Sequence, residues 1–129
     1  MSEKRVVRTE AAPAPFQGAP YSQAVVAGGF VFVSGQLGLR RGDNAISGGI
    51  EEQTEQVFAN LKAILEEAGT SLDGLVKTTV FLQHLGDFQA MNTVYAKHVG
   101  TQPPARATVE VAKLPSGALV EIEAVALLP

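Results

Sequence analysis

The segment from Ile50 to Ala68 constrains the fold more than any other part of this chain. Its apolar residues recur at spacings of three and four, and acidic residues with one lysine stand between them. The face so defined comprises Ile50, Thr54, Val57, Phe58, Leu61, Ile64, Leu65 and Ala68. This pattern predicts an amphipathic α-helix that ends at Gly69, where glycine suits the left-handed conformation. A helix with one apolar face needs a second layer, which the remaining segments must provide.

Strands are predicted on both sides of this helix from their β-branched and aromatic content. They cover about residues 5–9, 23–27, 30–34, 75–82, 106–113 and 119–128. Gly28 and Gly29 form a two-residue hairpin signal, because both turn positions can take a positive φ. The segment "AAPAPFQGAPY", residues 11–21, is predicted to be an ordered, extended loop.

A second helix is predicted from Asp87, as its N-cap, to about Val99. Pro103 and Pro104 prevent it from continuing. Its inward residues would be Phe88, Met91, Val94 or Tyr95, and His98 or Val99. The order β-β-β-α-β-α-β-β predicts one α+β domain over residues 1–129, in which two helices pack on one face of a mixed sheet. The other sheet face is left uncovered, which favours self-association.

Composition excludes several classes of function. The 129 residues contain no cysteine, which excludes disulfides, thiolate metal sites and a cysteine nucleophile. The net charge of −3 gives no general attraction to nucleic acid, even with the adjacent Arg40 and Arg41. No apolar run reaches the roughly 18 residues that a membrane span needs, and the N-terminus lacks the apolar region of a secretory signal. We therefore expect a cytoplasmic protein that is not bound to a membrane.

No metal or nucleophile motif stands out either. His84 and His98 lie without carboxylates at ligand spacing, so no metal site is expected. Ser22 and Ser34 are not in the G-x-S-x-G context of a hydrolase serine. The glycines before Ile50 lack the lysine of a phosphate-binding loop.

Arg106 and two glutamates leave alternatives open. Along a strand, Arg106, Thr108 and Glu110 share one face. Arg106 is either an edge-strand residue paired with Glu110 or Glu123, or a clamp for a carboxylate or phosphate, whose oxygens match the two parallel donors of a guanidinium. Glu121 and Glu123 share a face of an otherwise apolar strand, which is either half-exposed or functional.

Five ordered motifs resemble the successive signatures of one family. They are "APYSQAV", "VSGQ", "DFQAMNTVY", "PPARATVEVAKLP" and "VEIEAVA", and the similarity runs from about Thr9 to the end of the chain. They resemble the Rid (YjgF, or L-PSP) family of 2-iminopropanoate and enamine deaminases. The resemblance implies a chorismate-mutase-like fold and a homotrimer with active sites between subunits, with neither cofactor nor metal.

The same resemblance implies roles for individual residues. Arg106 would bind the substrate carboxylate, and Glu121 would hold and polarise the attacking water. The pocket would be lined by Tyr21, Ser34, Gly35, Asn92 and Thr108. The chain departs from the family pattern at Thr108, where a cysteine is common, and at Ala19, where a glycine is common. Regulation through that thiol is therefore absent here.

The implied reaction is hydrolysis of a 2-imino acid, such as 2-iminopropanoate, to a 2-oxo acid and ammonia. The alternatives are an endoribonuclease or translation inhibitor, which the acidic charge and the two scattered histidines disfavour, and a non-catalytic ligand-binding or chaperone-like trimer. If the last two strands formed a hairpin, Glu121 would lie opposite a residue about five positions from Arg106, or roughly 16 Å away. One small substrate cannot bridge that gap, so we expect a site shared between subunits.

Overall fold

A computed structural model describes residues 3–129 as a six-stranded sheet with two α-helices. Along the chain the strands are β1 (Arg5–Val7), β2 (Ala24–Ala27), β3 (Phe30–Leu37), β4 (Leu75–Leu82), β5 (Ala105–Glu110) and β6 (Val120–Leu127). The helices are α1 (Ile50–Ala68) after β3 and α2 (Phe88–Val99) after β4. Short 3-10 turns lie at Phe16–Gly18, Leu72–Gly74, Leu85–Asp87 and Pro115–Gly117. The order β-β-β-α-β-α-β-β and the α+β class are therefore confirmed.

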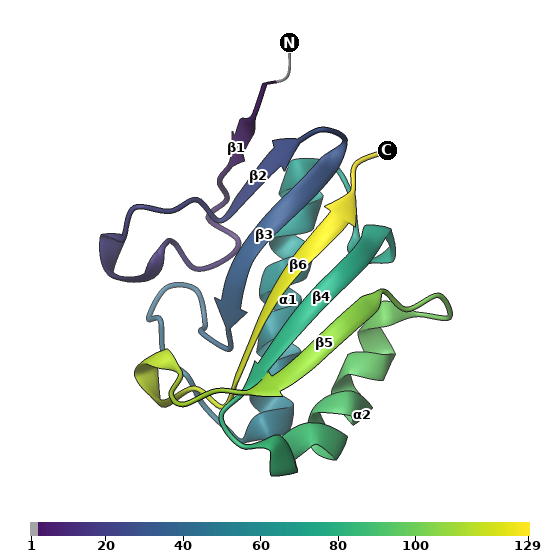
Figure 1. The fold of residues 1–129 in the computed structure, drawn as a ribbon. Helices are drawn as coiled ribbons and strands as arrows, with labels where there is room; N and C mark the ends of the chain where they lie inside the picture. The colour runs from purple at the N-terminus through teal and green to yellow at the C-terminus, as the bar shows by residue number, and fades with distance from the viewer. Residues whose placement is uncertain (1–2) are drawn as a thin grey trace.

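The sheet has the order β1-β2-β3-β6-β4-β5 (Figure 1). Neighbouring strands are antiparallel except β4 and β5, which are parallel because α2 carries the chain back across the sheet between them. The last two strands do not form a hairpin, since β4 lies between β5 and β6. Arg106 is therefore on an edge strand, and Glu121 is near the middle of the sheet.

Both helices cover the same face of the sheet (Figure 1). The apolar face of α1 supplies five side chains without exposed surface: Val57, Phe58, Leu61, Ile64 and Leu65. Each contributes about 2 kcal/mol on leaving water, which fixes α1 against the sheet. The helix has the predicted bounds, and Gly69 ends it in the left-handed conformation, with φ of 103°.

Three local predictions have mixed outcomes. Gly28 and Gly29 form the β2–β3 turn with φ of 59° and 83°, as predicted. Strand β3 extends to Leu37, beyond the predicted end at Ser34, through an irregularity between Val33 and Gln36. Asp87 precedes α2 but makes no capping hydrogen bond with its side chain, so that part of the prediction is wrong. Its backbone closes a 3-10 turn, with φ of −83° and ψ of 3°, instead of the extended conformation of a capping residue.

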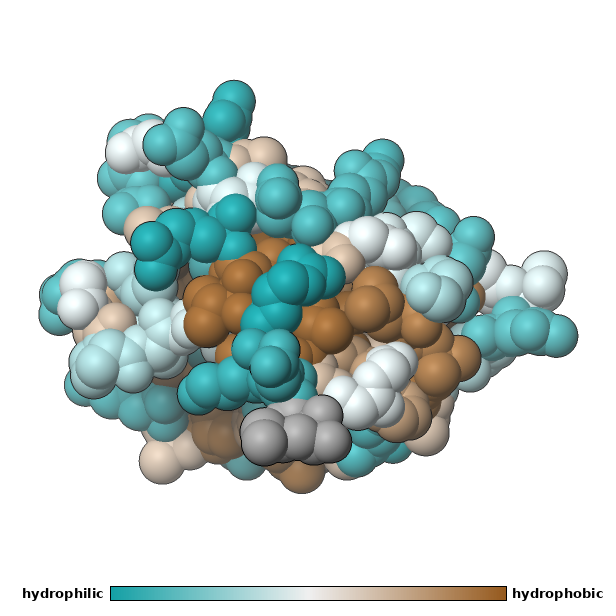
Figure 2. Space-filling model, turned by 90° about the horizontal axis from the view of Figure 1, so that it is seen from above, coloured by the Kyte–Doolittle hydropathy of each residue, from teal (hydrophilic) through white to brown (hydrophobic). Residues whose placement is uncertain are grey.

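The opposite sheet face is covered at one end only. There the loops before α1 and after β5 pack a small apolar cluster of Leu37, Leu39, Leu114 and Ala118 on the sheet. At the end where β3 begins and β6 ends, Phe30, Phe32 and Leu127 are 37%, 46% and 50% exposed. Seen from above, apolar surface lies between hydrophilic residues (Figure 2). This exposed apolar area agrees with the expectation that part of the sheet face without helices is left uncovered in a single chain.

Candidate functional site

The predicted site residues divide into two groups on opposite faces of the sheet. Arg106 is paired in register with Thr78, whose side chain is fully buried on the helix side. Glu121 alternates with Val120 and Ile122, which are fully buried on the helix side, so its own side chain points to the other face. The two charged residues are thus separated by strand β4 and by the thickness of the sheet.

The first group surrounds Glu121 in a cleft of about 500 Å³. Tyr21, Ser34, Gly35 and Glu123 line this cleft together with Glu121. Four of these five were predicted as site residues, and Glu123 was left open between a functional and a half-exposed position. We call this group the glutamate half-site. It lies where β3 and β6 pair beside the loop that carries Tyr21.

Gly35 allows the Glu121 side chain to lie close against β3. A β-carbon at position 35 would lie 2.9 Å from Cδ of Glu121, closer than real β-carbons approach other atoms. Ser34, next to it, donates a hydrogen bond from Oγ to the carbonyl oxygen of Ser22 at 2.6 Å. The predicted serine and glycine therefore have separate effects: one ties β3 to the loop, and the other makes room for the carboxyl group.

Glu121 has an electrostatic environment that disfavours its charge. Partial burial raises the pKa of its carboxyl group, and the negative charge of Glu123 raises it further. Within residues 3–129, no basic side chain forms an ion pair with Glu121. A carboxyl group whose pKa is raised is a stronger base than an ordinary carboxylate, which suits it to accept a proton and return it.

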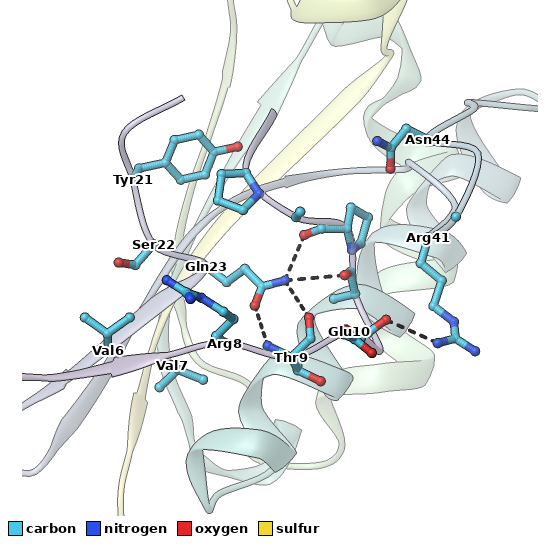
Figure 3. Close-up of a pocket in the computed structure, with 15 residues that line it drawn as sticks. Val6, Val7, Arg8, Thr9, Glu10, Tyr21, Ser22, Gln23, Arg41 and Asn44 are labelled. Atoms are coloured by element: carbon cyan, nitrogen blue, oxygen red, sulfur yellow. Dashed lines mark hydrogen bonds between the residues drawn. The ribbon is translucent and has the colours of Figure 1, made fainter. Parts of the chain in front are cut away.

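The loop before β2 is ordered by the amide of Gln23, which sequence reasoning did not identify. Its Nε2 donates to the carbonyl oxygens of Thr9 and Pro13 at 3.1 and 2.8 Å, and its Oε1 accepts from the backbone of Thr9 at 2.7 Å (Figure 3). The hydroxyl of Tyr21 accepts a hydrogen bond from the backbone N–H of Phe16 at 2.6 Å. These bonds hold Tyr21 on the wall between the glutamate half-site and a neighbouring cleft of about 490 Å³.

The second group, the arginine half-site, lies between β5 and α2. Arg106 lines a cleft of about 360 Å³ together with Asn92, Tyr95 and Pro103. Its guanidinium carbon lies 4.7 Å from the ring centre of Tyr95 and 5.5 Å from that of Phe88. Phe88 and Tyr95 were predicted only as inward residues of their helix. Their contact with Arg106 was not predicted, although the pairing of an aromatic ring with a guanidinium is a common one.

The ion-pair interpretation of Arg106 is wrong. Glu110 instead accepts a hydrogen bond from the backbone of Leu85 at 2.8 Å, and Glu123 lies on the opposite face. Among the residues that the structure describes, Arg106 has no carboxylate partner. Its charge and its hydrogen-bond donors therefore remain available to an acidic ligand.

Of the two other predicted residues, Asn92 lines the cleft of the arginine half-site, whereas Thr108 is not among the residues that line it. Thr108 follows Arg106 on the same face of β5, and Asn92 lies on α2. Asn92 Oδ1 and Thr108 Oγ1 are both buried without a hydrogen-bond partner in residues 3–129. Buried polar atoms are rarely left unpaired, so each of these two oxygens could still accept a hydrogen bond from another polar group.

No group of three potential metal ligands occurs among residues 3–129. His98 instead donates a hydrogen bond from Nε2 to Oε1 of Glu55 at 2.7 Å. None of the helices in residues 3–129 has both the length and the apolar character that a membrane crossing requires. The cytoplasmic location remains a prediction.

Comparisons with known proteins agree with these features. The family model described as Endoribonuclease L-PSP matches residues 9–128. A RutC family protein of Pyrococcus abyssi is 49% identical over 124 residues, which cover 95% of this chain and 96% of that protein. A protein of Dermatophagoides farinae named 2-iminobutanoate/2-iminopropanoate deaminase is 40% identical over 129 residues, or 99% of each.

A solved structure extends the similarity to three dimensions. The crystal structure of Escherichia coli TdcF with bound serine is 36% identical, with a TM-score of 0.89, and the match covers 97% of this chain and 99% of that one. Both the motif order and the sheet topology are thus those of a known group of proteins. The chain belongs to the endoribonuclease L-PSP family, which is also called the Rid or YjgF family.

Proposed function

We propose that this protein is a deaminase that hydrolyses 2-imino acids, such as 2-iminopropanoate, to 2-oxo acids and ammonia. The observation that carries the proposal is the complementarity of the two half-sites. One holds a cation without an acidic partner, and the other holds a carboxyl group with a raised pKa. Hydrolysis of a small carboxylate substrate needs a cation to bind the carboxylate and a base to take a proton from water. The two half-sites together provide these two groups.

In this proposal, the two half-sites of one active site come from different copies of the chain. Arg106 and Glu121 lie on opposite faces and on strands that are not neighbours. A second copy that covers the exposed sheet face would place its arginine half-site against the glutamate half-site of the first. Three copies related in this way close into a ring with three equivalent sites, which is the homotrimer that the family resemblance implies.

In the proposed reaction, Arg106 binds the carboxylate of the imino acid through parallel N–H donors and so fixes the imine carbon. Glu121 accepts a proton from a water molecule as the water oxygen bonds to that carbon. The C=N π electron pair moves to the nitrogen, which takes this proton and gives a carbinolamine. Glu121 then accepts the hydroxyl proton as the C=O bond forms, and this second proton is delivered to the nitrogen as the C–N bond breaks, so that NH3 leaves with the bonding electron pair. General base catalysis of this kind contributes roughly 10²- to 10⁴-fold.

Two comparisons support this substrate class. The relative from Dermatophagoides farinae is named as a deaminase of 2-iminobutanoate and 2-iminopropanoate. The structure of TdcF contains serine, a small molecule with a carboxylate and a nitrogen on the neighbouring carbon. A 2-imino acid has the same arrangement of groups, so the Arg106 and Glu121 half-sites would meet its two ends.

The test generates the imino acid in place with an amino-acid oxidase and traps the remaining imine with semicarbazide. We expect the wild type to lower the trapped product, and Arg106→Ala and Glu121→Ala to lose this effect. Thr93→Ala, on the exposed side of α2, is the matched control and should behave as the wild type. No acceleration by the wild type over buffer would overturn the proposal, and RNA cleavage that persists in both variants would favour an endoribonuclease.

A further inference from the structure

Arg106 is held by aromatic rings rather than by an acid. Its guanidinium carbon lies over the ring of Tyr95 at 4.7 Å and near that of Phe88 at 5.5 Å. An acidic partner would orient the side chain equally well, but it would occupy the donors and cancel the charge that a substrate carboxylate needs. An aromatic face attracts the cation through the ring quadrupole and leaves the N–H groups at the edge of the guanidinium free.

Tyr95 itself is fixed from two sides. Its hydroxyl forms a buried hydrogen bond of 2.7 Å with Oγ1 of Thr78. Its ring meets the ring of Phe58 edge to face, with centres 5.4 Å apart and planes at 82°. Thr78 is also the residue of β4 that pairs in register with Arg106 on β5. The strand that carries the arginine and the ring that supports it are therefore tied to the same residue.

We propose that Tyr95, with Phe88, is a positioning residue that presents the Arg106 guanidinium to a ligand carboxylate. The inference rests on the proposed function in one respect, namely that Arg106 binds a carboxylate. The contact of the guanidinium with the Tyr95 ring restricts the Arg106 side chain before the ligand arrives, so less side-chain freedom is lost on binding. The ring carries this effect, and the hydroxyl serves to hold the ring in place.

The test measures binding instead of turnover. The probe is 2-oxobutanoate, a carboxylate of the product class, titrated by calorimetry into the protein. The variants are Tyr95→Phe, which keeps the ring, and Tyr95→Leu, which removes it, each with and without Arg106→Ala. Thr93→Ala on the same helix is the control. Circular dichroism melting establishes that each variant is folded.

We expect Tyr95→Leu to weaken 2-oxobutanoate binding by about tenfold and Tyr95→Phe by no more than about twofold, given the usual strength of a cation–π contact. In the Arg106→Ala background, Tyr95→Leu should have no further effect, because the group on which it acts is gone. If Tyr95→Leu does not fold, Phe88→Leu, whose ring is only partly buried, replaces it, with an expected loss of about threefold.

Three results would overturn the inference. They are an equal loss with and without Arg106, a loss in Tyr95→Phe as large as in Tyr95→Leu, and no binding of 2-oxobutanoate by the wild type. The outcome is separate from that of the proposed function. A wild type that binds 2-oxobutanoate through Arg106 and Tyr95 but hydrolyses no imine would contradict the deaminase proposal and leave the role of Tyr95 in place.

Discussion

The two half-sites hold their charged groups in opposite ways. Arg106 lies on the edge strand, over two aromatic rings, and keeps its charge without a partner. Glu121 lies near the middle of the sheet against Gly35 and close to Glu123, where its charge is disfavoured. Among the described residues, neither Arg106 nor Glu121 forms an ion pair, so each half-site has one charged group without an opposite charge. This difference between the two half-sites is the basis for the proposed site shared between two copies of the chain.

The largest effects are expected from removing the charged groups themselves. Arg106→Ala should lower kcat/KM for 2-iminopropanoate by about 10²- to 10³-fold, mainly through KM, because a charged hydrogen-bond pair to the substrate is lost. Glu121→Gln should lower kcat by about 10²- to 10⁴-fold with KM little changed, because only the proton carrier is lost. Steady-state kinetics separates the two parameters. The same pattern for both variants would show that the half-sites do not have different roles.

A smaller effect is expected from crowding Glu121 without changing any charge. Gly35→Ala would place a β-carbon 2.9 Å from Cδ of Glu121 and force the carboxyl group to move. A displacement of this size should lower kcat by about tenfold to a hundredfold while the protein stays folded. Gly86→Ala is the matched control, because a β-carbon there meets no atom within 4 Å. Equal kcat values for Gly35→Ala and Gly86→Ala would show that the position of the Glu121 carboxyl group does not affect the reaction.

The charge of Glu123 should control the pH at which activity begins. It raises the pKa of Glu121, after the larger effect of burial, so Glu121 ionises at a higher pH than an ordinary glutamate. Glu123→Gln removes the repulsion, and the acid limb of the kcat/KM profile should then shift to lower pH. Thr79 pairs with Glu123 across the strands, and Thr79→Val provides an uncharged control. An unchanged acid limb would exclude the coupling between the two glutamates.

The smallest effect concerns charges that already have partners. Glu55 on α1 pairs with Lys97 at 2.9 Å and with His98 at 2.7 Å on α2, and Lys97 is the larger cause that lowers the pKa of Glu55. A lowered carboxyl pKa adds stability above the ordinary pKa of glutamate, and this stability is lost as the pH falls through the folded value. Lys97→Ala should therefore lower the free energy of unfolding by roughly 0.5 kcal/mol at pH 7, a small effect because the pair is exposed. The effect should be smaller near pH 3, where the stability that the lowered pKa provides is being lost.

Lys97→Ala tests the difference between a paired and an unpaired cation, because Lys97 has a carboxylate partner in Glu55 and Arg106 has none among the described residues. It should leave imine hydrolysis unchanged, and chemical denaturation at the two pH values measures the difference in stability. A loss of activity in Lys97→Ala comparable to that of Arg106→Ala would mean that the distinction between paired and unpaired cations has no functional meaning.

Much of the fold follows from local sequence patterns. Helix α1 and strand β4 have their predicted bounds, because periodicity and β-branched content are properties of neighbouring residues. The end of β3 was missed because Gly35 resembles the end of a strand, whereas the strand passes through it with an irregularity. Asp87 failed as a cap because the turn before it, and not its residue type, determines its backbone angles.

The site was predictable only in parts. Alternation along the strands placed Arg106 with Thr108 and Glu121 with Glu123, and both groupings are found on β5 and β6. Strand β4 lies between these two groups, and their side chains point to opposite faces of the sheet. Both facts depend on pairing between distant segments of the chain, which no local pattern specifies. The contact of Arg106 with Tyr95 depends on how α2 packs on that edge. The roles of the individual residues come from the family resemblance and remain predictions.

The most direct test of a site shared between subunits mixes two inactive variants. Arg106→Ala and Glu121→Ala are unfolded together in equal amounts, refolded, and assayed for imine hydrolysis. If each site takes its arginine from one chain and its glutamate from a neighbour, random assembly leaves about a quarter of the sites with both residues, and about a quarter of wild-type activity returns. If both residues act within one chain, every chain lacks one of them. The mixture would then stay as inactive as either variant alone, which would contradict the shared site.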